Sequence, residues 1–126
     1  MIVLAEDDDG TRTVLEHALQ RNGYEVTAVA DGQLVWPIIA GGGVELLILD
    51  LRMPGMNGWE VLRRLKATRR PEQGTAPDLP IIVISAQSDP ETRSFAVRLG
   101  ADAFMAKPVD LKDFGRAVRD VLGATL

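Results

Sequence analysis

The sequence predicts a single α/β domain built on a five-stranded parallel sheet. Short apolar runs alternate with amphipathic segments of helical spacing along the whole chain, and most connections between them are short. The run at 44–49 has no polar alternation, which is typical of a strand covered on both faces. Five such strands alternating with five helices indicate a parallel sheet with right-handed crossovers. A chain of 126 residues without repeats or low-complexity tracts fits one domain over 1–126.

The first half of the chain predicts two strands, at 2–5 and 24–30, each followed by a helix. The first helix is expected over 11–21, with Asp9 as its N-cap and Asn22-Gly23 as its end. The second helix opens at Asp31-Gly32, and the glycines at 41–43 end it. Pro37 lies inside this helix and should kink or shorten it. The residues at core spacing are Val14, Leu15, Ala18 and Leu19, then Leu34, Val35, Ile38 and Ile39.

The second half predicts three strands, at 44–49, 81–84 and 103–105, again each followed by a helix. The polar segment 69–80 contains proline and glycine and is expected to be a mobile loop. Asp89-Pro90 is a strong start signal for a helix that ends at Gly100, and Asp110 caps the last helix. The inward residues of the three helices are expected to be Trp59, Val61, Leu62 and Leu65; Phe95, Ala96 and Leu99; and Leu111, Phe114, Val118, Val121 and Leu122.

Composition excludes several classes of protein. The absence of cysteine excludes disulfides and thiolate metal sites. No stretch resembles a signal peptide, and no window reaches 18 uninterrupted apolar residues, so we expect a cytoplasmic protein without a membrane span. The formal net charge of -4 argues against nonspecific binding of nucleic acid by this domain.

Polar side chains collect where the predicted strands end. The carboxyl ends of parallel strands meet at one edge of a sheet, and ligands of open α/β sheets bind there. This edge should carry Glu6, Asp7 and Asp8 from the first strand, Asp50 from the third, Ser85 from the fourth and Lys107 from the fifth. Close carboxylates repel strongly unless they protonate or hold a cation. An all-oxygen ligand set suits Mg²⁺ or Mn²⁺. With Lys107 and Ser85 to bind phosphoryl oxygens, Asp50 is a candidate nucleophile for an acyl phosphate.

Four segments at these strand ends resemble the receiver domain of two-component response regulators: AEDD, LILDLRMPGMNG, VISA and GADAFMAKP. The resemblance covers essentially the whole chain and implies a flavodoxin-like, doubly wound sheet with strand order 2-1-3-4-5. It also implies that Asp50 is the phospho-acceptor and that Ser85 and Lys107 contact the phosphoryl oxygens. The implied metal site consists of Asp7, Asp50, the backbone carbonyl of Arg52 and, in the outer sphere, Glu6.

The resemblance implies a signalling module and not an enzyme with a separate substrate. A partner histidine kinase or a phosphotransfer protein would donate a phosphoryl group to Asp50. Ser85 would then swing toward the phosphoryl group, and Phe104 at the switch position would turn inward. The output surface would be the fourth helix, the fifth strand and the fifth helix, and phosphorylation could drive homodimer formation. Arg52 and Gln87 flank the path of the hydrolytic water, and because Arg52 offers no carboxylate or amide to orient water, we expect a long-lived phosphoryl group.

Two alternative functions remain open at this stage. A phosphatase of the haloacid-dehalogenase type also uses a strand-end Asp nucleophile, but it needs a second Asp two positions on, where this chain has Arg52. A phosphorylation-independent binding module would use only its surfaces. The sequence does not identify the output, the pathway or the cognate kinase. It is compatible with a stand-alone regulator, with a DNA-binding regulator and with a hybrid kinase.

Other polar residues have plainer interpretations. Asp8 is expected to be solvated or to cap a helix, and not to bind metal. His17 should be a surface residue without a phosphorelay role. Phe104 taken alone fits a core position as well as a switch. A basic run is expected to form a solvated helix end, with a partner surface as the alternative; it comprises Arg63, Arg64, Lys66, Arg69 and Arg70.

Overall fold

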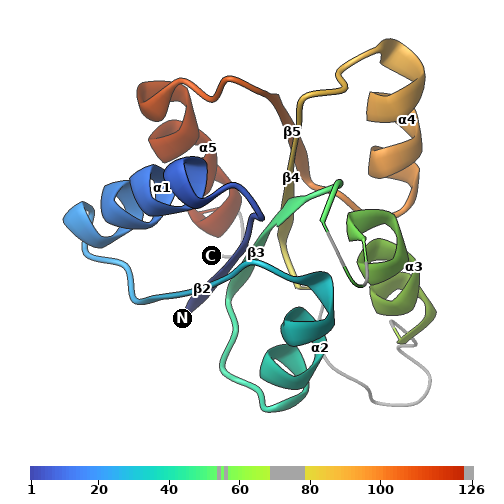
Figure 1. Cartoon of the computed structure of the whole chain (residues 1–126), viewed down its shortest axis with the longest axis horizontal. Helices are drawn as coiled ribbons and strands as arrows, with labels where there is room; N and C mark the ends of the chain where they lie inside the picture. The colour runs from blue at the N-terminus through green and yellow to red at the C-terminus, as the bar shows by residue number, and fades with distance from the viewer. Residues whose placement is uncertain (54, 56, 69–78, 124–126) are drawn as a thin grey trace.

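The fold is a five-stranded parallel sheet in the order β2-β1-β3-β4-β5, which confirms the predicted class and strand order (Figure 1). The computed structural model describes residues 1–53, 55, 57–68 and 79–123, with the side chains of 66 and 68 left out. The strands are β1 (Ile2–Ala5), β2 (Val26–Val29), β3 (Leu46–Asp50), β4 (Ile81–Ser85) and β5 (Ala103–Ala106). The helices are α1 (Asp9–Arg21), α2 (Gly32–Ala40), α3 (Gly58–Thr68), α4 (Pro90–Arg98) and α5 (Leu111–Gly123).

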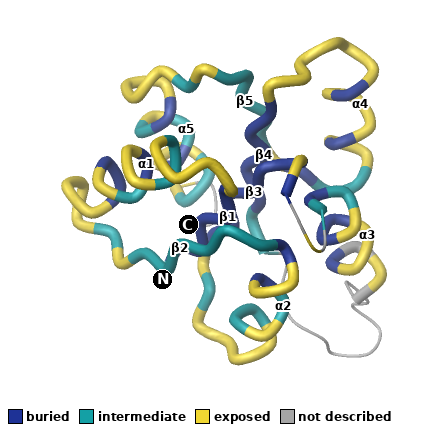
Figure 2. The backbone as a smooth tube through the Cα atoms, in the orientation of Figure 1, coloured by how far each residue is buried: buried dark blue, intermediate teal, exposed yellow. Residues whose placement is uncertain are grey.

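The sheet separates two apolar cores, because successive side chains of each strand point to opposite faces. One core lies against α2, α3 and α4, and the other lies against α1 and α5 (Figure 1). The central strands β1, β3 and β4 are buried at every residue, whereas β2 and β5 at the two edges are half-buried (Figure 2). The apolar runs of the sequence are therefore the strands that both layers of helices cover.

Strand register brings the predicted site residues to one edge of the sheet. Ala5 pairs with Leu49, so Glu6 and Asp50 follow neighbouring positions on β1 and β3. Asp50 in turn pairs with Ile84, the residue before Ser85. Ser85 pairs with Ala106, the residue before Lys107. Each of these side chains lies at or just past a carboxyl end, as parallel pairing requires.

Aspartates fix the starts of four helices. Asp8, and not Asp9, is the N-cap of α1, because its side chain accepts a hydrogen bond from the Thr11 amide at 2.8 Å. The predicted start was therefore wrong by two residues, and the expectation that Asp8 caps a helix is confirmed. The other three caps agree with the prediction and are Asp31 for α2, Asp89 for α4 and Asp110 for α5. Each cap satisfies amides of a first helical turn that lack partners within the helix.

Pro37 does not end α2, which continues to Ala40 and stops at Gly41. The predicted stop of α1 at Asn22 and Gly23 is also found, with Gly23 in the left-handed region at φ 88°. The mobility expected for 69–80 cannot be assigned, since 69–78 lie outside the described residues. Arg63 and Arg64 are exposed as expected, whereas the rest of the basic run falls outside the described side chains.

Four residues placed in the core by helical spacing are exposed instead. The exposed fractions are 49% for Val14, 52% for Leu34, 42% for Phe95 and 39% for Leu111. The buried stripe of α1 is narrower than predicted and consists of Leu15, Ala18 and Leu19. Phe95 lies at the edge of α4, where its ring packs against the ring of Trp59 with centroids 5.2 Å apart. No helix in the described part of the chain has the length and apolar character needed to cross a bilayer.

Candidate phosphoryl-acceptor site

Three carboxylates converge at the carboxyl edge of the sheet. Glu6 and Asp7 directly follow β1, and Asp50 is the last residue of β3. Each residue offers a carboxylate oxygen, and these oxygens lie within 4.8 Å of one another. Glu6 and Asp50 are buried, whereas Asp7 is exposed. The cluster therefore has two acids inside the protein and one at the solvent boundary.

Lys107 supplies the positive charge that the buried acids require. Its Nζ atom lies 2.6 Å from Oε1 of Glu6 and 3.1 Å from Oδ2 of Asp50. The lysine side chain is 22% exposed, so the ion pairs are only partly screened by water. The backbone positions Lys107 as well, because its amide donates a hydrogen bond to the Ser85 carbonyl at 2.9 Å. The ammonium group thus neutralises the acid that follows β1 and the acid that ends β3.

Burial and mutual contact shift the three ionisation equilibria in different directions. Burial, helped by a hydrogen bond and repulsion from Asp50, raises the pKa of Glu6 to about 7. Burial also acts to raise the pKa of Asp50, but hydrogen bonds from Glu6, the Arg52 amide and Lys107 outweigh it and lower that pKa. Burial acts against the charge of Lys107, but Glu6 and Asp50 raise the pKa of its ammonium. Asp50 is therefore an anion at neutral pH, while Glu6 is divided between its two forms.

The carboxylates keep acceptor capacity that suits a cation. Within the described chain, Oε1 of Glu6 is buried without a hydrogen bond of good geometry, although the ammonium of Lys107 is in ionic contact with it. Oδ1 of Asp50 accepts one bond, from the Arg52 amide at 3.2 Å. Each carboxylate oxygen can accept about two bonds, so lone pairs remain at the cluster. Three clustered oxygen donors without nitrogen or sulfur fit Mg²⁺ or Mn²⁺.

Arg12 supports the cluster and was missed by sequence reasoning. Its Nη1 atom donates to the carbonyl of Glu6 at 2.9 Å and to the carbonyl of Asp7 at 3.4 Å, and its Nη2 atom pairs with Asp9. The guanidinium thereby fixes the backbone that carries the two acids directly after β1. The only signal in the sequence is a cation one helical turn after an acidic run, which is also common on solvated helices.

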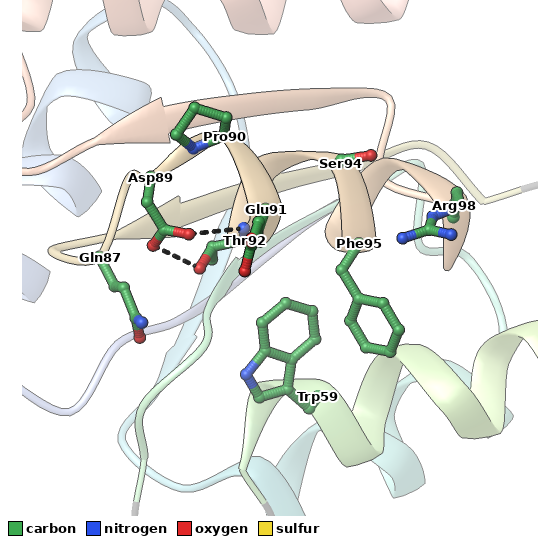
Figure 3. A pocket seen from close by; sticks show the side chains of 9 residues that line it. All are labelled: Trp59, Gln87, Asp89, Pro90, Glu91, Thr92, Ser94, Phe95 and Arg98. Atoms are coloured by element: carbon green, nitrogen blue, oxygen red, sulfur yellow. Dashed lines mark hydrogen bonds between the residues drawn. The ribbon is translucent and has the colours of Figure 1, made fainter.

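A cavity of about 500 Å³ adjoins the acids and has Asp7, Arg52, Asn57, Trp59, Ser85 and Gln87 among its lining residues. Trp59 and Gln87 also line a second cavity of about 580 Å³ between α3 and α4, so the two cavities share a wall (Figure 3). Asp7 and Ser85 thus line one open space beside the two buried acids.

Ser85, Gln87 and Arg52 line this cavity, whereas Phe104 and His17 do not. Ser85 is buried, and its Oγ accepts a hydrogen bond from the Gln87 amide at 3.0 Å. The side chain of Arg52 is exposed. Phe104 is half-buried on β5, where its ring packs against the core that faces α4. His17 is exposed on α1, as expected.

Close approach of α3 fixes the backbone of the acceptor residue. A Cβ atom added to Gly58 would lie 2.3 Å from the Asp50 carbonyl oxygen and 2.6 Å from Cα of Leu51. Real Cβ atoms do not approach backbone so closely, which means that only glycine fits at the start of this helix. The amide of Gly58 donates to the Leu51 carbonyl at 3.1 Å.

Comparison with known proteins identifies the family to which this arrangement belongs. The profile of the response regulator receiver domain matches residues 2–119. The chain belongs to this family. Receiver domains are signalling modules rather than enzymes with separate substrates, and they interact with histidine kinases. The acidic cluster of Glu6, Asp7 and Asp50 is typical of the Mg²⁺ site of receiver domains.

The curated relatives are longer than this chain. The DNA-binding transcriptional regulator NtrC of Rhizobium meliloti is 37% identical over 94% of this chain and 24% of its own length. The transcriptional regulatory protein AfsQ1 of Streptomyces coelicolor is 36% identical over 96% of this chain and 50% of its own length. This chain therefore spans a quarter to a half of these relatives.

Solved structures share the same fold. The receiver domain of the sensor histidine kinase PA1611 from Pseudomonas aeruginosa has a TM-score of 0.82 and 27% identity, and covers 97% of this chain and 96% of its own. That structure contains a magnesium ion coordinated in its active-site cleft. The Francisella response regulator 1452 receiver domain has a TM-score of 0.86, with 99% and 98% coverage, but its identity of 22% supports the fold alone.

Proposed function

We propose that residues 1–126 form one phosphorylation-controlled receiver unit in which Asp50 accepts a phosphoryl group. The observation that carries this proposal is the contact of Lys107 with both buried acids, Glu6 and Asp50, beside the exposed carboxylate of Asp7. An ammonium within 3.1 Å of the acceptor carboxylate can neutralise the charge of an incoming phosphoryl group.

The proposed metal site consists of Asp7, Asp50 and the backbone carbonyl of Arg52, with Glu6 in the outer sphere. When bound, Mg²⁺ or Mn²⁺ would neutralise phosphoryl oxygens and hold them in line with the acceptor. The free acceptor capacity of Glu6 and Asp50 supports this assignment. The ligand role of the Arg52 carbonyl rests on family resemblance.

The transfer is a displacement at phosphorus. An oxygen of the Asp50 carboxylate forms the new bond to phosphorus, and the phosphorus–nitrogen bond of a phosphohistidine breaks. The departing imidazole retains the electron pair and takes up a proton. Asp50 suits the nucleophilic role because its pKa is lowered, so that it is ionised at neutral pH. The chain supplies mainly position and charge neutralisation.

The phosphoryl group would then change the partners of Ser85. In the described structure the Ser85 hydroxyl accepts from the Gln87 amide, and its own proton can be donated to a phosphoryl oxygen if the side chain rotates toward Asp50, which would lengthen the bond from the amide. Movement of Ser85 would leave space that Phe104 fills by turning inward. The surface formed by α4, β5 and α5 would thereby change and could bind an effector or a second copy of the chain.

Hydrolysis of the acyl phosphate should be slow in this chain. Arg52 and Gln87 line the cavity beside the acids, and we infer that water reaches Asp50 from this cavity. A guanidinium has no acceptor atom with which to orient a nucleophilic water. We therefore expect the phosphoryl group to persist, and a lifetime of a few seconds would contradict this expectation.

Phosphorylation can be tested with a small-molecule donor. Incubation with acetyl phosphate and Mg²⁺ should add one phosphoryl mass to the wild-type chain, and chelation of Mg²⁺ should abolish it. Asp50→Asn should prevent labelling, whereas Asp120→Asn, at an exposed acid on α5, should leave it unchanged. Labelling that survives Asp50→Asn would refute the assignment of the acceptor.

The same samples separate the alternative functions. Failure of the wild type to take up phosphoryl groups or to bind beryllofluoride with Mg²⁺ would favour a phosphorylation-independent binding module. Rapid multiple turnover of a phosphomonoester would favour the haloacid-dehalogenase type of phosphatase. Size-exclusion chromatography with light scattering before and after phosphorylation tests the expected homodimer, and transfer from a phosphorylated histidine kinase or phosphotransfer protein tests the class of donor.

A further inference from the structure

Arg93 on α4 contacts two of the segments that the proposed switch would move. Its guanidinium carbon lies 4.9 Å from the centroid of the Phe104 ring, within the range of a cation–π interaction. Its Nε atom donates a hydrogen bond to the Ser88 carbonyl at 3.2 Å. The side chain is exposed, so it contributes little to the core. One exposed arginine therefore joins α4, the loop after β4 and the half-buried ring on β5.

The loop contact links Arg93 to the hydroxyl beside the acceptor site. Ser88 lies three residues after Ser85, and the intervening Gln87 donates its amide to the Ser85 hydroxyl at 3.0 Å. The loop is followed by a fixed helix start, because Asp89 accepts from both the amide and the hydroxyl of Thr92 (Figure 3). The segment between Ser85 and α4 is thus held at both ends, and Arg93 adds a third attachment at Ser88.

We propose that Arg93 is a positioning residue that holds Phe104 and the loop after β4 in the resting arrangement. This inference rests on the proposed function and adds to it the residue that sets the balance between the two states. If Phe104 turns inward, its ring leaves the face of the guanidinium, and if Ser85 turns toward Asp50, the loop that carries the Ser88 carbonyl shifts. Arg93 therefore favours only the resting state, and its loss should make activation easier.

Among the cation–ring contacts of the described residues, the Arg93 guanidinium is the one over Phe104. Glu91 and Arg98 belong to the same helix, and the Arg98 guanidinium lies over the other aromatic ring of α4, Phe95, at 5.8 Å. Figure 3 shows Arg98 beside Phe95 at the far end of the groove from Gln87. Arg98 is therefore a matched control: an arginine of α4 stacked on an aromatic ring that the proposed switch does not use.

The first experiment measures the affinity of the chain for beryllofluoride with Mg²⁺, which mimics the phosphorylated state. Arg93→Met removes the charge and the donor but keeps an apolar stem, and it should raise the affinity about two- to fivefold. Arg98→Met should leave the affinity unchanged. Arg93→Lys keeps a cation without the guanidinium Nε donor and should give an intermediate value.

A double-mutant cycle separates the contact with the ring from a general effect on the fold. In Phe104→Leu, which has no π face, Arg93→Met should have a clearly smaller effect on affinity than in the wild type. An equal effect in both backgrounds would overturn the role assigned to the ring. Unchanged or weaker binding of beryllofluoride by Arg93→Met would overturn the proposal as a whole.

A measurement without any phosphoryl analogue distinguishes the failure of this inference from the failure of the proposed function. The chain has three phenylalanines, so fluorophenylalanine labelling gives few fluorine signals, and Phe104→Leu assigns one of them. Arg93→Met should shift or broaden the Phe104 signal and leave that of the buried Phe114 unchanged. If the wild type does not bind beryllofluoride, the proposed function fails, and the fluorine spectrum alone decides whether Arg93 holds the ring. An unaltered Phe104 signal would refute that role.

Discussion

Removal of the Lys107 ammonium is the most direct test of the electrostatics of this site. In Lys107→Met, Glu6 and Asp50 lose a cation that lies 2.6 and 3.1 Å from their oxygens. Removing one partner of a buried ion pair typically costs about 3–5 kcal/mol, because the remaining charge stays buried without compensation. Glu6 limits this loss, since its pKa is already about 7 and the group can take up a proton. We therefore expect the free energy of unfolding at pH ~7.5 to fall by about 2–3 kcal/mol.

The loss of stability in Lys107→Met should increase as the pH rises. The pKa of Glu6 is raised in the folded state, so its favourable contribution is complete below the unfolded pKa and is lost as pH rises through about 7. Without the ammonium that lowers it, the pKa of Glu6 should rise further, and stability should continue to fall above neutral pH. The stability difference between wild type and Lys107→Met should therefore widen by about 1 kcal/mol from pH ~6 to pH ~8.

Urea unfolding in the presence of a chelator, followed by circular dichroism, measures this difference. Lys112→Met is the matched control, because Lys112 is an exposed lysine on α5, and it should change stability by less than about 0.5 kcal/mol. A difference below about 0.5 kcal/mol for Lys107→Met that does not vary with pH would refute the electrostatic account of the site.

Two further outcomes follow from the packing and the charge of the same edge. Gly58→Ala should lower the free energy of unfolding by about 2 kcal/mol or more, because the new methyl group would overlap the Asp50 carbonyl. Gly10→Ala is the control: a Cβ atom there would have its nearest contact at 3.5 Å, so urea unfolding should show a neutral or slightly stabilising effect. Mg²⁺ should bind about tenfold more tightly at pH ~8 than at pH ~6, since the proton of Glu6 competes with the ion. Quenching of Trp59, which lines the cavity beside Asp7, would report this binding, and an affinity independent of pH would contradict it.

The sequence was sufficient to predict the strands and the residues at their ends, because an apolar run buried on both faces has few alternative structures. Asp50, Ser85 and Lys107 could be brought together from topology alone, since parallel strands end at a common edge. The sequence did not decide which of two neighbouring aspartates caps the first helix. Asp8 and Asp9 are both good caps, and only the backbone geometry and the bond from the Thr11 amide decide between them.

Features that depend on how a helix is rotated against the sheet could not be predicted from the sequence. Phe95 has the spacing of a core residue, yet α4 is rotated so that Ala96 is buried and Phe95 meets Trp59 at the surface. Arg12 and Arg93 reach across loops to carbonyl groups, and the pattern of apolar residues holds no information about such contacts. The pairing of Lys107 with Glu6 likewise requires coordinates, since the sequence favours a role for the lysine toward a phosphoryl group.

The hydrogen bond from the Lys107 amide to the Ser85 carbonyl provides a natural reporter of the site. This bond extends the ladder between β4 and β5 one step beyond Ala106, so the amide should exchange with solvent only when the two strand ends separate. The exchange rate of the Lys107 amide in deuterated water, compared with that of an amide in the middle of β3, would measure how often Ser85 and Lys107 separate. This measurement needs neither a label nor a ligand, and the exchange rate of one backbone amide reports how often the acceptor site opens.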